Sequence, residues 1–316
     1  MTRIGAGSGP TGAAGTAQRG IGRNVADSWR GFRTAVRLGW QTEANWTDPL
    51  LFFIYSVAKP VAAALMLVFM LEVISAGRAD PALRAFIVVG SAMWSFVVGG
   101  AAGLALSVLE DRERYRMLKY LYVSPNALLV LLLGRGTARV VIGGFGALIT
   151  LIVGVVFLGV PFDAARVDWL VAVLSMTLGL VAVLSLGVIL ASIAMQTRQE
   201  AWQYPEAVAG ALFLVVGAVF PLLVLPAPAQ IVGLAMPLTW WLEGVRQGLF
   251  PGILSAIGGR GSIYSAWTGI GAPSSGDVLV ALAVTTAAAA VLSVLVFRWS
   301  EHSAMEKGVF DLVTGS

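Results

Sequence analysis

The stretch VVIGGFGALITLIVGVVFLGV, residues 140–160, contains no charged side chain. A helix of about 20 apolar residues is long enough to cross the hydrocarbon core of a bilayer. Apolar segments of similar length occur on both sides of this stretch, and together they predict six membrane-spanning helices at about 50–74, 85–109, 140–160, 170–195, 207–225 and 278–297. Because every backbone polar group must be satisfied inside a bilayer, we expect an all-α, polytopic membrane protein.

The composition indicates the same class of protein. Of the 316 residues, 58% are hydrophobic and 12% are charged, and the mean hydropathy is +0.84. Soluble domains are typically about 45–50% apolar and about 25% charged. A soluble enzyme, a disordered chain and a disulfide-stapled secreted domain are therefore excluded. With no cysteine and a single histidine, His302, the chain is expected to bind no metal or cofactor and to have no catalytic residues.

The N-terminal region divides into two parts. Residues 1–25 are rich in Gly, Ala, Ser and Thr, and are expected to form a flexible cytoplasmic tail. Residues 26–46 predict an amphipathic helix, because large apolar side chains recur at helical spacing beside a stripe of arginines: Trp29, Phe32, Val36 and Trp40, with Arg30, Arg33 and Arg37. Such a helix suits the headgroup region of a membrane, where it would contact lipids. The alternative is a solvated helix packed on a partner protein.

The distribution of positive charge predicts the orientation. If both termini are cytoplasmic, most of the 21 Lys and Arg residues lie in the tails and loops on the cytoplasmic side. This bias follows the positive-inside rule and indicates a multi-pass protein of the cell membrane, with residues 301–316 as a cytoplasmic C-terminal tail. The net charge of +4 is explained by residues that flank the spans, so that a nucleic-acid partner is not expected.

A charged segment follows the second predicted span. Residues 110–125 read EDRERYRMLKYLYVSP, a charged run that leads into apolar residues at helical spacing and ends at Pro125. We interpret residues 110–124 as a short lever helix that lies against the membrane and docks on a cytoplasmic partner. The alternative is a solvated loop helix held by pairs such as Glu110 with Arg114, each worth only about 0.3–0.5 kcal/mol.

These residues resemble a known family. The run from Glu110 to Glu113, followed by Leu121-Tyr122-Val123-Ser124-Pro125, resembles the cytoplasmic signature of ABC-2 type permeases. A second resemblance follows the fifth span, in Phe220-Pro221-Leu222, Leu225-Pro226, Met236-Pro237-Leu238-Thr239 and Glu243-Gly244-Val245-Arg246. Tyr115-Arg116 stands where the family commonly has Gly-Thr, and Met236 stands where it commonly has Asn. With the six-span layout, the resemblance covers residues 26–300, which we take as one transmembrane domain.

The resemblance implies the transmembrane subunit of an ATP-binding cassette exporter that works as a homodimer or heterodimer of permease subunits. Segment 110–124 would be its coupling helix, which contacts the ATPase through Glu110, Asp111, Arg112, Glu113, Arg114, Leu118, Leu121, Ser124 and Pro125. A nucleotide-binding P-loop needs Gly-Lys followed by Ser or Thr, and the chain contains no Gly-Lys pair. ATP and Mg²⁺ are therefore expected on a separate ATPase subunit.

Charged and aromatic residues near the spans are candidates for the pathway or its gates: Lys59, Glu206, Pro237, Trp240, Trp241, Glu243 and Arg246. Lys59 could meet an anionic substrate, or it could extend to the headgroups. Glu243 and Arg246 are three residues apart and are expected to pair with each other. They belong to a helix expected to dip into the outer leaflet, with Trp240 and Trp241 at the interface or along an exit path.

Three classes of function differ in how well they fit this sequence. An exporter of an amphipathic, drug-like or lipid-linked substrate agrees with the resemblance. A secondary transporter or channel without ATP coupling is the alternative, but such proteins place carboxylates near the middle of the bilayer, and the acids here lie at span ends or in loops. A membrane-embedded enzyme has the least support, since the spans contain no Cys, no His and no paired carboxylates.

Overall fold

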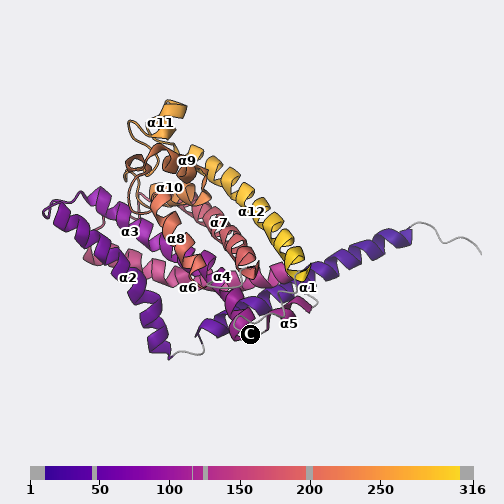
Figure 1. The fold of residues 1–316 in the computed structure, drawn as a ribbon. Coiled ribbons are helices and arrows are strands. Elements are labelled where there is room, and N and C mark those ends of the chain that lie inside the picture. Colours follow the sequence, from indigo (N-terminus) through magenta and orange to yellow (C-terminus); the bar gives the residue numbers. More distant parts are fainter. Residues whose placement is uncertain (1–10, 45–47, 116, 124–126, 197–201, 307–316) are drawn as a thin grey trace, which may run out of the picture.

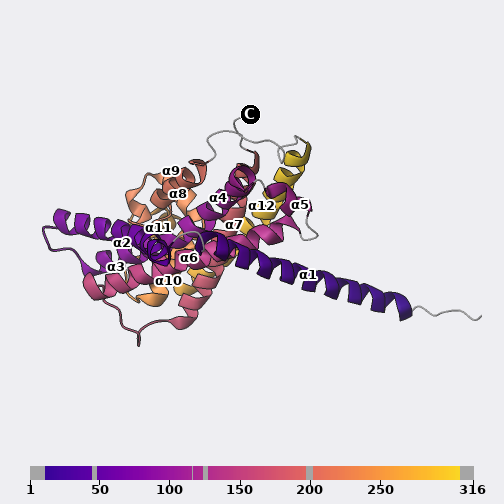
Figure 2. The ribbon, with the colours of Figure 1, turned by 90° about the horizontal axis from the view of Figure 1, so that it is seen from below.

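The computed structural model describes residues 11–44, 48–115, 117–123, 127–196 and 202–306. Within these ranges the regular elements are all helical, which confirms the predicted fold class. Figure 1 shows a bundle of long helices with a cap of short helices at one end and one helix, α1, that projects from the bundle. The view in Figure 2 shows the same projection of α1.

One long helix lies at the centre of the bundle. It runs without interruption from Pro81 to Arg114 and is largely buried. It contains two stretches of wider π-helical turns, and its parts are α3 (Pro81–Phe96), η1 (Val97–Ala102), α4 (Gly103–Leu109) and η2 (Glu110–Arg114). Around it pack α2 (Pro49–Ile74), α6 (Leu128–Phe157) and α7 (Trp169–Gln196), and α12 (Ser275–Glu306) packs along α7.

Four of the described helices are long and apolar enough to cross a membrane: Pro81–Arg114, Leu128–Phe157, Trp169–Gln196 and Ser275–Ala304. They correspond to the predicted spans 85–109, 140–160, 170–195 and 278–297. The first predicted span, 50–74, corresponds to α2, whose bounds agree with it to one residue. The count of six spanning helices is not established by these lengths.

The fifth predicted span, 207–225, needs correction. Helix α8 (Tyr204–Val215) has 12 residues, and the chain leaves the helical path directly after it. Gly217 has φ 71°, a left-handed conformation that glycine adopts without strain. Pro221 then leads into the single turn η3 (Leu222–Val224). A continuous apolar stretch is thus divided because one glycine and one proline redirect the backbone.

The third span and the charged segment before it also differ from the prediction. Helix α6 begins at Leu128, ahead of the predicted residue 140, and so includes Arg135 and Arg139. Residues 110–114 extend the central helix, and a separate short helix, α5 (Leu118–Val123), follows. The single helix expected over 110–124 is therefore two pieces joined by a bend near Tyr115. Ser124 and Pro125 lie outside the described residues.

The first helix differs in extent and in the face that it buries. It runs from Thr11 to Ala44 and so begins inside the predicted tail. Its second half packs on α6 through small residues, with Ala35 against Gly134 and Gly39 against Ala138. This close approach is typical of small residues between membrane helices. The side chains of Trp29 and Trp40 remain exposed beside this contact.

A cap of short helices covers the opposite end of the bundle from η2, as Figure 1 shows. It consists of α9 (Ala227–Ala235), α10 (Pro237–Leu249) and α11 (Ile263–Thr268). Helix α10 packs on α7 and α12, and its side chains from Leu238 to Arg246 are buried. The helix predicted to lie in the outer leaflet is therefore enclosed by protein.

Candidate functional site

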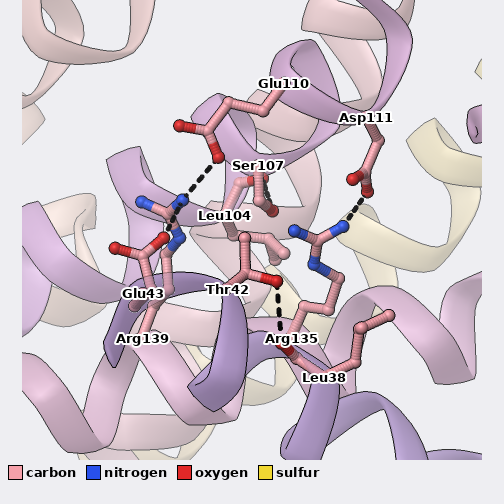
Figure 3. Close-up of polar contacts among 9 residues, drawn as sticks. All are labelled: Leu38, Thr42, Glu43, Leu104, Ser107, Glu110, Asp111, Arg135 and Arg139. Carbon is pink, nitrogen blue, oxygen red and sulfur yellow. Dashed lines mark hydrogen bonds and ion pairs between the residues drawn. The ribbon is translucent and has the colours of Figure 1, made fainter. Parts of the chain in front are cut away.

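Five charged side chains gather where α1, η2 and α6 meet, and we call them the charged cluster: Glu43, Glu110, Asp111, Arg135 and Arg139. In Figure 3, Asp111 and Arg135 point toward each other and form an ion pair. Arg139 serves two carboxylates, since its Nη2 lies 2.9 Å from Oε2 of Glu110 and also pairs with Glu43. The cluster therefore ties three helices together by ion pairs.

Local sequence explains how these groups meet. Arg135 and Arg139 are four residues apart on α6 and so project from one face. Glu110 and Asp111 are adjacent in sequence, and they reach different arginines. Both acids belong to η2, and π-helical turns inside α-helices are frequent at functional sites.

Burial makes the Asp111–Arg135 pair energetically important. Asp111 is 0% exposed and Arg135 is 3% exposed. Removing one partner from a buried ion pair leaves a charge without compensation and costs about 3–5 kcal/mol. The cluster also contains three carboxylates for two guanidinium groups. The pKa of Glu43 is raised from its ordinary value, mainly because burial disfavours the charged carboxylate. The positive charge of Arg139 opposes this rise, and the negative charge of Glu110 adds to it.

Arg112 extends the network to α7. Its Nη1 donates hydrogen bonds to the carbonyl oxygens of Ala194 (3.1 Å) and Met195 (3.3 Å). These carbonyls lie in the last turn of α7, where the helix itself supplies no donor. Arg112 also pairs with Glu113 at 2.7 Å, and Oε2 of Glu113 accepts a hydrogen bond from the indole N–H of Trp202. The end of the central helix is thus attached directly to α6, α7 and Trp202, and through Arg139 to α1.

This geometry changes the interpretation of segment 110–124. Its charges were expected to face a partner, but Asp111 and Arg112 are buried and contact other helices of the same chain. Leu118 is buried too, and Leu121 is half-buried. Among the described side chains of this segment, Arg114, Tyr115 and Tyr120 are exposed, and Tyr120 is 69% exposed. The described exposed side chains of the segment therefore lie at the bend and after it.

Sequence reasoning missed the side chains that complete this site: Glu43, Arg135, Arg139 and Trp202. A signal existed for two of them, because Arg135 and Arg139 interrupt an apolar run four residues apart. Charges at such positions nearly always face a partner inside a membrane protein. No sequence pattern links Glu43 or Trp202 to this segment.

A second buried polar group lies in the cap. The guanidinium of Arg246 is fully buried and donates hydrogen bonds to the carbonyl oxygens of Gly217 (2.9 Å), Ala218 (2.7 Å) and Phe86 (3.3 Å). It also lies 3.6 Å from the centre of the Phe86 ring. These bonds satisfy the carbonyls freed where α8 ends, and they fasten α10 to α3. Arg246 therefore connects α10 to α3 and to the residues that follow α8.

Glu243 does not form the predicted ion pair with Arg246, because each side chain has its own partners among the described residues. Glu243 accepts hydrogen bonds from the Ser255 hydroxyl at 2.6 Å, the Ala256 backbone N–H at 2.8 Å and the Gln247 amide at 3.0 Å. Its carboxylate thereby anchors the loop that follows α10. The two charges hold different parts of the cap.

Both tryptophans of α10 are buried, which corrects their expected interfacial position. Trp240 donates its indole N–H to the carbonyl oxygen of Leu234 at 2.8 Å, and Trp241 is 0% exposed. Pro237 occupies the first turn of α10, where its missing N–H costs nothing.

The other candidates lie apart from these clusters. Glu206 is exposed in the first turn of α8. Lys59 is exposed on α2 beside Pro60, at a cavity between α2, α3, α6 and α8. Among the described residues, no group of three His, Cys, Asp or Glu side chains could hold a metal ion.

The long apolar helices define the class of protein, a helical, multi-pass membrane protein. Buried ion pairs and hydrogen bonds connect its helices to one another. Comparison with known families gives the family. The sequence pattern of the ABC-2 type transporter matches residues 32–250, and the chain belongs to this family. Its members are the membrane subunits of transporters that associate with an ABC ATPase. No curated protein matches this chain.

Proposed function

We propose that this chain is the permease subunit of an ATP-binding cassette exporter and that a separate ATPase subunit powers it through η2 and α5. The observation that supports the proposal is the direct attachment of residues 110–113 to three parts of the chain, α6, α7 and Trp202. Helix α1 joins the same network through the Glu43–Arg139 pair. A push on this segment reaches all of them through ion pairs and hydrogen bonds rather than through a flexible loop.

In this mechanism the ATPase contacts the exposed side chains around Tyr115 and Tyr120. Its closure on ATP displaces the bend, and the buried pairs transmit the displacement to α6 and α7. A cavity of about 500 Å³ between α1, η2 and α6 leaves room for this movement. Asp111 and Arg112 are thus positioning residues, which act through other helices and do not touch the partner.

The remaining features of the proposal follow from the family and from the charge distribution. Two permease subunits, identical or different, form the transporter in the cell membrane. Both termini lie in the cytoplasm together with the charged cluster, and α1 contacts lipid headgroups through its arginines. The substrate is an amphipathic molecule, drug-like or lipid-linked, and it leaves the cell.

The test separates docking from transmission. The tagged permease is co-expressed with its candidate ATPase, and co-purification and ATPase activity in nanodiscs are measured. Tyr120→Glu is expected to abolish co-purification. Asp111→Asn is expected to keep the ATPase bound but to uncouple its activity from added substrate. Asp163→Asn, which removes an exposed acid paired with Arg166, is the control and should change neither.

Two outcomes would contradict the proposal. If a folded wild-type permease binds no ATPase, an uncoupled transporter or channel becomes the function to examine. If Asp111→Asn releases the ATPase as fully as Tyr120→Glu does, transmission through the buried pairs is wrong even though docking stands.

A further inference from the structure

A cavity of about 440 Å³ lies between α2, α3, α6 and α8, away from the charged cluster and from the cap. Its size is within the range of small-molecule sites, about 300–1,000 Å³. Most of its wall is apolar, with Met66 and Leu67 from α2 and Ile142 from α6. Trp94 and Phe213, whose ring centres are 4.9 Å apart, form an aromatic surface within it.

Two serine hydroxyls in this wall have no hydrogen-bond partner within the described parts of the chain. Ser91 and Ser95 are one turn apart on α3, and the Oγ atoms of both are buried. Serine in a membrane helix usually donates to the carbonyl four residues earlier, as Ser185 and Ser192 do here. Because a buried hydroxyl without a partner costs free energy, each group would be stabilised by a ligand acceptor that reached it.

Lys59 is the charged residue of this cavity. Of the described residues that line the cavity, it alone carries a charge, and it forms no ion pair with another described side chain. A lysine at this depth in an apolar helix is costly unless it reaches water or an anion. The cavity therefore offers one ammonium group and two hydroxyl donors, and none of the residues given for its wall is acidic.

We propose that this cavity binds an amphiphile with an anionic head, such as a carboxylate or a phosphate monoester. The Lys59 ammonium and the serine hydroxyls hold the head, and the apolar part lies along Trp94, Phe213 and Met66. Taking this molecule as the exported substrate rests on the proposed function. Binding itself does not, because it requires only the permease.

The experiment measures equilibrium binding to the purified permease without ATPase, in nanodiscs of phosphatidylcholine. The two radiolabelled probes are dodecyl phosphate and dodecyltrimethylammonium, which share a chain and differ in the charge of the head. A charge-assisted hydrogen bond to lysine should favour the phosphate by about tenfold in Kd. Lys59→Gln should remove this preference, and Lys59→Arg should retain most of it. Ser91→Ala combined with Ser95→Ala should weaken phosphate binding alone.

Two further variants separate the site from the surrounding surface. Arg37→Gln removes an exposed positive charge from α1, outside the cavity, and should leave the preference unchanged. Ala63→Phe introduces a ring at an exposed position of the cavity wall and should weaken both probes. If Lys59→Gln does not yield folded protein, Lys59→Arg and Ala63→Phe together still decide the question.

Several results would overturn the inference: equal binding of the two probes, tighter binding of the ammonium probe, or an equal loss in Arg37→Gln and Lys59→Gln. Unchanged binding in Ala63→Phe would do the same, because it would place the probe elsewhere. If the preference holds and no ATPase couples, the cavity stands and the proposed function fails. If the preference is absent and the ATPase couples, only the substrate class is wrong.

Discussion

Asp111 at the end of the central helix and Arg135 on α6 form an ion pair inside the protein, although 24 residues separate them in sequence. Both side chains are buried. The pair therefore acts between helices, and its loss affects the permease before it affects any partner.

Asp111→Asn is expected to lower the free energy of unfolding by about 3–5 kcal/mol, because Arg135 is left as an uncompensated buried charge. Replacing both residues by Asp111→Leu and Arg135→Met should cost less than Asp111→Asn alone, since no buried charge remains. Thermal unfolding of the purified variants checks this order. A double variant less stable than the single one would show that the pair contributes net stability.

The raised pKa of Glu43 predicts a pH dependence. The folded state binds the Glu43 proton more tightly than the unfolded state, whose pKa is near the ordinary 4.5. The resulting stabilisation is complete below pH 4.5 and is lost as pH rises through the raised pKa. Melting temperatures measured across this window should fall less steeply with pH in Glu43→Gln than in the wild type. Thr34→Ala, which changes an exposed uncharged side chain on the same helix, should keep the wild-type slope.

Two glycines offer a matched comparison of packing. A methyl group at Gly179 would overlap the indole ring of Trp241, whereas nothing lies within 4 Å of the same position at Gly210. Gly179→Ala is expected to destabilise the protein by about 1–3 kcal/mol. Gly210→Ala lies in α8 and should be neutral or stabilise by up to about 1 kcal/mol. Equal melting temperatures for the two variants would show that Trp241 moves without cost.

The stability of the protein should fall even when Arg246 is replaced by lysine. Arg246→Gln leaves up to two buried carbonyls without a donor, those of Gly217 and Ala218, at about 1–3 kcal/mol each. Arg246→Lys keeps the charge but cannot reproduce a planar fork that reaches Gly217, Ala218 and Phe86 together. We expect both variants to unfold at lower temperature, and limited proteolysis should cut first between α8 and α9. Full stability of Arg246→Lys would mean that charge alone holds the cap.

The apolar runs of the sequence predicted the bounds of two long helices well. The predicted segments 50–74 and 170–195 agree with α2 and α7 to one residue at each end. In both segments the length and apolar composition of the run are sufficient to place the helix ends, although α2 contains Lys59 and Pro60. The long central helix was predicted too short, because the charges after Leu109 indicated the end of the span and the start of a separate short helix.

Those charges belong in the helix because groups distant in sequence neutralise them. Arg139 is paired by Glu110 and Glu43, and Arg112 is satisfied by carbonyls of α7. A prediction from hydropathy treats each charged residue as unpaired. It therefore ends the predicted helix at Leu109, although ion pairs with other helices allow the helix to continue to Arg114. The prediction also missed the break after α8. Gly217 does not interrupt the apolar run, and hydropathy does not report its left-handed backbone conformation.

The hydrogen bonds of Arg246 also have an electrical consequence. Carbonyls freed by a broken helix ordinarily recruit water at that depth, and a continuous file of water conducts protons. At the end of α8 the guanidinium and the Phe86 ring occupy that space. The break is thus insulated, and in this conformation we expect the break to pass no proton current. Movement of Arg246 away from Gly217 and Ala218 would uncover these carbonyls, and we expect proton leakage to report it.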